Sequence, residues 1–151
     1  MFKPFFMLII ASLWLAGCAT AGHAPPPVAG RIAPREAIVA AADAAPRGVP
    51  GVFAMQVTAT GRIGGRVFLN SEADYRDQRN LTIAIEPRAA ERLAALHGAA
   101  PESYFRGKSI EVRGAARRVR IDFIENRRPT GLYYYQTHVP VTDPEQISIV
   151  G

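Results

Sequence analysis

Apolar and polar residues alternate with a period of two along most of the chain after residue 50. In residues 53–61, Phe53, Met55 and Val57 share one face, and the side chains between them are mostly polar. Such alternation predicts a strand with one buried face. Similar patterns predict further strands at about 66–70, 80–85, 109–123, 132–141 and 145–150.

One segment of this region has a helical pattern instead. Residues 87–98 open with Pro87, contain Ala, Leu, Glu and Arg, and end at Gly98. Proline in the first turn and glycine just past the last turn are typical of helix ends. We expect Leu93 and Leu96 to form the buried side of this helix.

A charged run, NSEADYRDQR at 70–79, separates the second and third predicted strands. Asp74 and Asp77 form a candidate carboxylate pair, but acid–base chemistry requires environments that separate the two pKa values. On a solvated loop both carboxyl groups simply ionise. The pattern therefore favours a loop between strands over an active site.

Three strands, one helix and then two or three strands is the element order of the OB-fold. The predicted fold class is thus all-β with one helix. In detail, we expect a five-stranded Greek-key β-barrel over residues 51–151, with the helix between strands three and four.

The N-terminus has the features of a bacterial export signal. Met1–Lys3 is positively charged, and Phe5–Ala16 is an apolar run shorter than the roughly 20 residues that span a bilayer. Leu15, Ala16 and Gly17 then precede Cys18, a sequence that resembles the lipobox of bacterial lipoprotein precursors. The alternative is that Cys18 is an ordinary residue of a signal peptide cleaved elsewhere, or of a buried N-terminal helix.

The lipobox resemblance implies a domain organisation and a location. Residues 1–17 would be the signal peptide, and Cys18 would carry the lipid, which includes an acyl chain such as palmitate. Residues 18–50, rich in Ala, Pro and Gly, would form a tether, within which a short helix beginning at Pro34 would end before Pro46. Since Ala19 is not the aspartate that retains such lipoproteins at the inner membrane, we expect an outer-membrane anchor facing the periplasm of a Gram-negative bacterium.

Residues 52–151 also resemble a group of OB-fold domains in secreted and lipid-anchored bacterial proteins, related to the barrel of staphylococcal-type nucleases. The most specific segments are Tyr104–Gly114 and Asp143–Ile147. The aspartate-rich and arginine-containing motifs of those nucleases are missing from this sequence. The resemblance therefore implies a barrel without nuclease chemistry, and we expect no enzyme activity.

Charge adds a candidate binding function. The chain has 18 basic and 13 acidic residues, and 16 of the basic residues are Arg, a side chain suited to bidentate contact with phosphate or carboxylate. High-GC coding alone also produces Arg-rich, Lys-poor chains. His23, His97 and His138 are too scattered for a metal site, and no cofactor is predicted.

The densest Arg and Tyr content lies beyond residue 114, where the two faces of a strand would separate arginines from apolar side chains. We consider two functions. The first is non-catalytic binding of a protein or an anionic envelope component, and the alternative is binding of single-stranded nucleic acid through Arg and aromatic side chains. A solvated Arg face with packed tyrosines would explain the same pattern without a ligand. The candidate ligand-binding residues are Arg117, Arg118, Arg120, Arg127, Arg128, Tyr133 and Tyr135.

Overall fold

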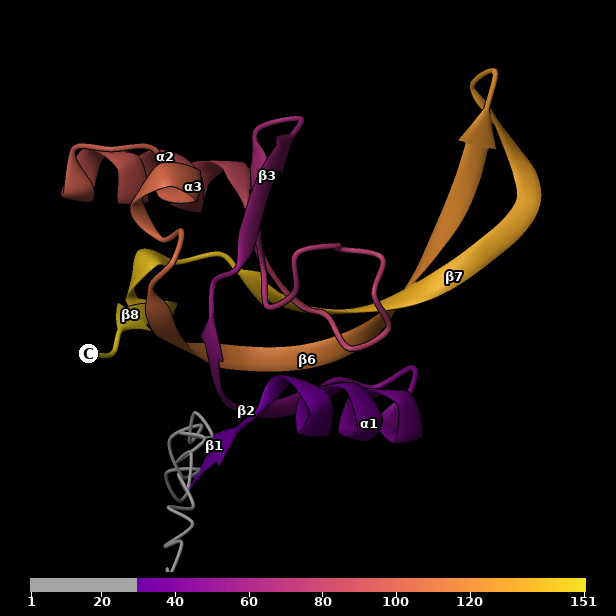
Figure 1. Ribbon diagram of the computed structural model, residues 1–151, viewed down its shortest axis with the longest axis horizontal. Helices are drawn as coiled ribbons and strands as arrows, with labels where there is room; N and C mark the ends of the chain where they lie inside the picture. The colour runs from indigo at the N-terminus through magenta and orange to yellow at the C-terminus, as the bar shows by residue number, and fades with distance from the viewer. Residues whose placement is uncertain (1–29) are drawn as a thin grey trace, which may run out of the picture.

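The computed structural model describes residues 30–151, so Cys18 and the predicted signal peptide lie outside the described residues. The chain is mostly β-structure with few helices (Figure 1). The helices are α1 (Pro34–Ala44), α2 (Pro87–His97) and α3 (Pro101–Tyr104), with a 3₁₀ turn η1 at Pro144–Gln146. The strands are β1 (Arg31–Ile32), β2 (Val49–Gln56), β3 (Ala59–Ile63), β4 (Arg66–Asn70), β5 (Leu81–Ile85), β6 (Ser109–Glu125), β7 (Arg128–Val141) and β8 (Ile147–Ile149).

The strands form one mixed sheet in the order β1-β2-β6-β7-β5-β4-β3, and β8 pairs with β6. Most neighbours are antiparallel, whereas β5 runs parallel to β7 from Leu81↔Thr137 to Ile85↔Val141. β2 and β3 are consecutive in the chain and are separated only by Val57 and Thr58, although β6, β7, β5 and β4 lie between them in the sheet order. The predicted first strand, 53–61, is thus divided into two strands with different partners.

Most of the predicted elements are present. The predicted helix at 87–98 is α2, which has proline in its first turn and Gly98 in the left-handed conformation, with φ of 66°, at its C-terminal end. The charged run is a loop between β4 and β5, as the sequence predicts. The turn after β6 is short, because β7 already begins at Arg128.

The predicted tether is wrong for residues 31–50, which belong to the folded unit. The predicted helix at Pro34 is present as α1, but it packs on the sheet, with Ala37 and Ala41 fully buried. β1 adds a parallel strand beside β2, and Arg31 forms an ion pair with Glu111. The prediction failed because alanine contributes little to an apolar pattern in the sequence. Its small side chain nevertheless allows a helix to pack closely against a sheet. With α1, the folded unit also has more than the one helix that the sequence predicts for it.

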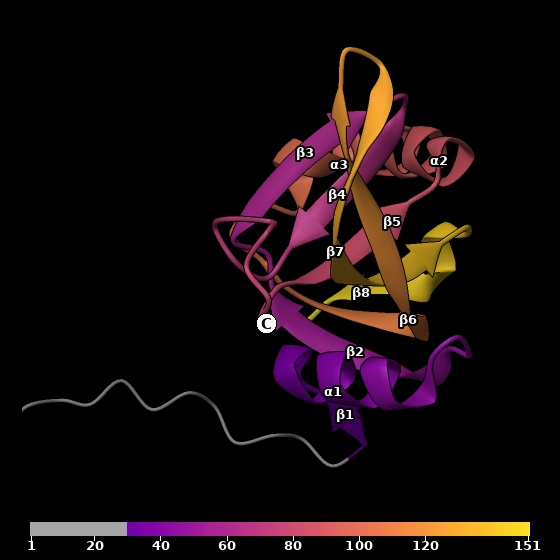
Figure 2. The ribbon, with the colours of Figure 1, turned by 90° about the vertical axis from the view of Figure 1, so that its right-hand side faces the viewer.

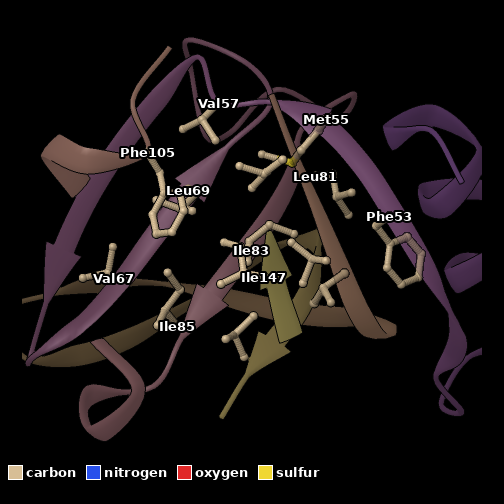
Figure 3. Packing of buried hydrophobic residues seen from close by; sticks show 14 of the residues in the cluster. Phe53, Met55, Val57, Val67, Leu69, Leu81, Ile83, Ile85, Phe105 and Ile147 are labelled. Atoms are coloured by element: carbon tan, nitrogen blue, oxygen red, sulfur yellow. The ribbon is translucent and has the colours of Figure 1, made fainter. Parts of the chain in front are cut away.

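The core lies between the curved sheet and its helices. Figure 3 shows side chains of β2, β4 and β5 pointing into one cluster with Phe105 and Ile147. Every residue of β5 is buried. Leu81, Ile83 and Ile85 belong to the core, and Thr82 on the other face bonds to Asn70 and Asn80. The alternation predicted from residue 53 is confirmed, because Phe53 and Met55 of β2 and Val57 just after it are all buried.

Two large apolar side chains are exposed: Leu96, expected on the buried side of its helix, and Phe123, at the end of the alternating segment 109–123. Leu96 is 69% exposed because Ala89, Ala90 and Leu93 form the buried side of α2. Phe123 is 45% exposed because β6 extends beyond the body of the protein at that point. Within residues 30–151, no helix is both long and apolar enough to span a membrane.

Candidate functional site

β6 and β7 form a hairpin that extends well beyond the rest of the sheet (Figures 1 and 2). β2 pairs with β6 only as far as Ala116, and β5 pairs with β7 only as far as Thr137, so the outer part of the ribbon contains only these two strands. The strands reverse through Asn126 and Arg127, which both have positive φ, as in a tight two-residue hairpin turn. We call residues 117–136 the projecting hairpin.

Four of the predicted ligand-binding residues form two stacked pairs on one face of the projecting hairpin. The guanidinium carbon of Arg118 lies 3.8 Å from the centre of the Tyr135 ring, and that of Arg120 lies 4.1 Å from the centre of the Tyr133 ring. The two tyrosines meet edge to face, with their ring centres 5.6 Å apart. Such stacks hold the guanidinium plane in place and leave its N–H edge free to donate.

The two arginines differ in charge balance. Arg120 also donates to Asp122, with a 2.9 Å hydrogen bond from Nε, so its charge is partly compensated. Among residues 30–151, Arg118 has no carboxylate within ion-pairing distance. Arg118 is therefore the cation of this face best placed to receive an external anion.

The other three predicted arginines do not join this face. Arg117 lies on the opposite face of β6, where its side chain packs close to Gly48. Arg127 is in the turn at the tip, and Arg128 follows it as the first residue of β7. The seven predicted ligand-binding residues thus fall into three groups. Four lie on the stacked face, two lie at the tip of the hairpin, and Arg117 lies on the opposite face.

A groove of about 550 Å³ runs along the stacked face. Arg118, Tyr133 and Tyr135 form one side of it, and Ile38 and Ala42 of α1 form another. The remaining wall comes from the loop between β4 and β5, and includes Arg76, Asp77 and Gln78. We call this the cationic groove.

A second groove of about 520 Å³ lies on the other face of the hairpin and has no charged residue in its lining. Tyr134, Gln136 and His138, at alternate positions of β7, form its floor beside Phe68. Gln136 links the other two residues. Its Nε2 donates to the Tyr134 hydroxyl at 2.8 Å, and its Oε1 lies 2.7 Å from His138 Nε2. We call this the neutral groove.

A buried polar cluster supports the wall of the neutral groove. Asn80 Nδ2 donates to Asn70 Oδ1 at 3.1 Å and to Thr82 Oγ1 at 2.9 Å, and the Thr82 hydroxyl donates to Asn70 at 2.9 Å. All three side chains are buried, and their mutual hydrogen bonds offset the cost of removing them from water. This cluster fixes the end of the charged loop against β4 and β5.

The candidate carboxylate pair in that loop has a structural explanation. Asp74 accepts a hydrogen bond from the backbone N–H of Arg76, and Asp77 accepts one from that of Arg79. Each aspartate also pairs with the same arginine's side chain. These backbone and side-chain bonds lower the pKa of Asp74 and lower that of Asp77 to about 2, so both are ionised at neutral pH. Two carboxylates in the same state do not provide an acid and a base.

His97 and His138, the histidines among the described residues, lie in different surroundings. His97 stacks on Tyr104 with ring centres 3.9 Å apart, and Lys108 lies over the same tyrosine ring. His138 lies in the neutral groove. Within residues 30–151 no group of three or more His, Cys, Asp or Glu side chains is arranged to hold a metal ion.

Comparisons with known proteins give little further information. No protein-family model matches the chain, and no curated protein matches it. Among solved structures, the chain is similar to an aspartyl-tRNA synthetase of Leishmania major Friedlin, with a TM-score of 0.41 and 10% sequence identity. The match covers 89% of this chain but only 23% of that one. A similarity of this size carries no argument about fold or function.

The sequence pattern did not reveal several residues of the two grooves. Ile38 and Ala42 lie in a segment that we expected to be a tether, and Asn80 was expected in a strand but not in a buried polar cluster. The sequence does contain one signal for the projecting hairpin, which is the length of an alternating segment. Alternation from residue 109 to 123 already exceeds the five or six residues of a common strand.

Proposed function

We propose that the folded part of this chain is a non-catalytic binding module that recognises an anionic group of a partner protein or envelope component. The observation that carries this proposal is Arg118, which is stacked on Tyr135, lines the cationic groove and has no carboxylate partner among the described residues. A guanidinium held flat on a ring loses little freedom when it donates two parallel bonds to a carboxylate or phosphate.

We further propose that the module is an OB-type barrel. β2 and β3 would be the two halves of one bent first strand, joined through Val57 and Thr58. With that assignment the order β2-β6-β7-β5-β4-β3 would lead from the first strand back to itself, and α2 would lie between the third and fourth strands. α1 and β1 would be additions to this barrel.

The module would be carried on a lipid at Cys18, on the periplasmic side of the outer membrane. Support comes from the four lipobox positions Leu15–Cys18 and from the apolar run before them. Several acyl chains anchor a protein far more firmly than one chain, because each buried CH₂ contributes about 0.8 kcal/mol.

Binding of single-stranded nucleic acid is the alternative, favoured by the exposure of Tyr133 and Tyr135, which are 50% and 42% exposed. Base stacking requires free ring faces. One face of each ring is already covered by a guanidinium, so at most one face of each ring is left for a base. This geometry favours anion recognition over stacking.

Three probes separate these functions: lipopolysaccharide, poly-L-glutamate and single-stranded oligo-dT, each titrated with residues 30–151. We expect lipopolysaccharide or poly-L-glutamate to bind, and Arg118→Gln to weaken that binding about tenfold, the size expected for a charge-assisted hydrogen bond. The control is Arg117→Gln, which removes the same charge from the opposite face and should change the affinity less than twofold.

The outcomes are distinct. Equal loss in both variants would mean that only net charge matters and would overturn the role of Arg118. Binding of oligo-dT alone, falling steeply with salt, would favour the nucleic-acid alternative. Failure of all three probes to bind would overturn anion recognition.

A further inference from the structure

We propose that the free edge of β7 accepts an extended peptide segment of a partner protein, with an acidic side chain of that peptide seated against Arg118. This inference rests on the proposed function, since it specifies the partner of the same cationic groove. It adds that the partner is recognised through its main chain as well as through its charge.

The first observation is an unpaired strand edge. On the side away from β6, β7 is paired with β5 only from Thr137 to Val141, although β7 itself begins at Arg128. Within residues 30–151, the backbone of residues 128–136 makes no backbone hydrogen bond outside its pairing with β6. An edge of this kind presents N–H and C=O groups that can pair with another strand.

The second observation is that the cationic groove follows this edge. Five consecutive residues, Tyr133–Thr137, line it. Because successive side chains of a strand point to opposite faces, a groove lined by five residues in a row runs beside the strand and not over one face only. Near Gln136 the loop closes over β7, since Gln136 Nε2 donates to the backbone oxygen of Tyr75 at 3.3 Å. The open part of the edge is therefore the stretch from the tip to Tyr135.

The charges of the groove select the peptide. Its other charged side chains have partners, because Arg76 pairs with Asp74 and Asp77 pairs with Arg79. An incoming carboxylate would thus meet Arg118. Ile38, Ala42 and Phe123 give the groove apolar walls as well. These features fit an extended segment in which an acidic residue is flanked at alternate positions by apolar ones.

The same charges disfavour a second copy of this chain as the occupant. Residues 117–128 contain five arginines but only two acidic residues, Asp122 and Glu125. Each hairpin therefore has a net positive charge, so two hairpins paired edge to edge would repel each other. A peptide of opposite charge meets no such repulsion.

The test uses residues 30–151 and a designed probe, the acetylated and amidated peptide Val-Glu-Val-Glu-Val. Two matched peptides serve as controls: one with Lys in place of Glu, and one with N-methyl groups on alternate residues, in each of the two registers. Isothermal titration calorimetry measures affinity, and amide hydrogen exchange measures protection at Tyr133–Gln136. We expect the Glu peptide to bind, the Lys peptide not to bind, and one N-methylated register to bind at least tenfold more weakly. We also expect exchange of the outward-facing amides of Tyr133–Gln136 to slow at least tenfold, and Arg118→Gln to weaken binding.

Each contrary result has a specific meaning. If both N-methylated peptides bind as well as the parent, or if no amide of Tyr133–Gln136 is protected, the edge is not used and this inference fails while anion recognition stands. The same holds if the Glu peptide fails but poly-L-glutamate or lipopolysaccharide still binds in an Arg118-dependent way. Protected amides together with a concentration-dependent dimer in the absence of peptide would identify a second copy as the occupant and overturn the peptide.

Discussion

His138 is a side chain whose charge state depends on its place in the neutral groove. Burial, with a smaller contribution from the Arg66 guanidinium, lowers the pKa of His138 from its usual value to about 4. The imidazole is consequently neutral at physiological pH, and its Nε2–H can donate to Gln136 Oε1. In the unfolded chain the same imidazole would be protonated below about pH 6.5.

This difference predicts an acid-dependent loss of stability. Between pH 6.5 and 4 the unfolded state binds a proton that the folded state does not, so the free energy of unfolding falls as the pH falls. From pH 7 to 4.5 the contribution of His138 is about 2 kcal/mol. Urea unfolding of the native chain and of His138→Gln at both pH values measures it.

The carboxyl groups also titrate in this range, and the comparison removes their effect. Relative to the native chain, His138→Gln should gain about 2 kcal/mol on acidification, because glutamine does not titrate. An unchanged difference between the two proteins at pH 7 and 4.5 would show that His138 titrates alike in the folded and unfolded states.

At the scale of the elements, α2 contains two leucines that differ sharply in burial. Leu93 is 1% exposed and Leu96 is 69% exposed, although they lie three positions apart on the same helix. Small residues on the buried side, Ala89 and Ala90, bring the helix close to the sheet. That close approach sets the rotation of the helix and leaves Leu96 outside.

Two substitutions in α2 test this orientation. We expect Leu93→Ala to lower the free energy of unfolding by about 2–5 kcal/mol, because it leaves a cavity in the core. The matched change Leu96→Ala should stay within about 0.5 kcal/mol of the native value, as exposed substitutions usually do. Urea unfolding measures both. Similar losses in the two variants would mean that Leu96 is packed in solution.

The sequence was most informative where local chemistry determines the element. Alternation and the Pro87–Gly98 pair predicted β2, β4, β5 and α2, because strand faces and helix ends depend on neighbouring residues. The burial of α1 was not predicted, since Ala37 and Ala41 carry little apolar signal and their packing depends on distant strands. Leu96 was misplaced for a similar reason.

The candidate site was predicted in part. Arg118, Arg120, Tyr133 and Tyr135 do share a face, as strand alternation implies, and their stacking follows from the pairing of β6 with β7. The register of that pairing changes between Asp122 and Ile124, and no local pattern signals the change. The walls from α1 and from the 76–78 loop depend on the tertiary fold, which is why the groove itself was not predicted.

At the scale of the whole molecule, the remaining proposal concerns attachment to a membrane. The lipobox prediction at Cys18 lies outside residues 30–151 and has its own test. In cells fed a palmitate analogue, the native precursor should be labelled and Cys18→Ala should not, since the thiol is the only one in the chain. Gel fluorescence of the purified proteins measures the label.

A neighbouring change provides the control. Thr20→Ala lies two residues past the cysteine and should leave labelling intact, because it does not alter the four lipobox positions. Label on Cys18→Ala, or none on the native chain, would contradict the lipoprotein assignment and leave the folded module unaffected.

The position of β1 has a consequence for orientation. Both ribbon views place β1 at one end of the molecule and the tip of the projecting hairpin at the other (Figures 1 and 2). A chain held by a lipid at Cys18 enters the folded unit at β1, only 13 residues later. The tip of the projecting hairpin would then lie at the end of the folded unit opposite the anchored end. Partners would reach it from solution and not from the bilayer to which the protein is attached.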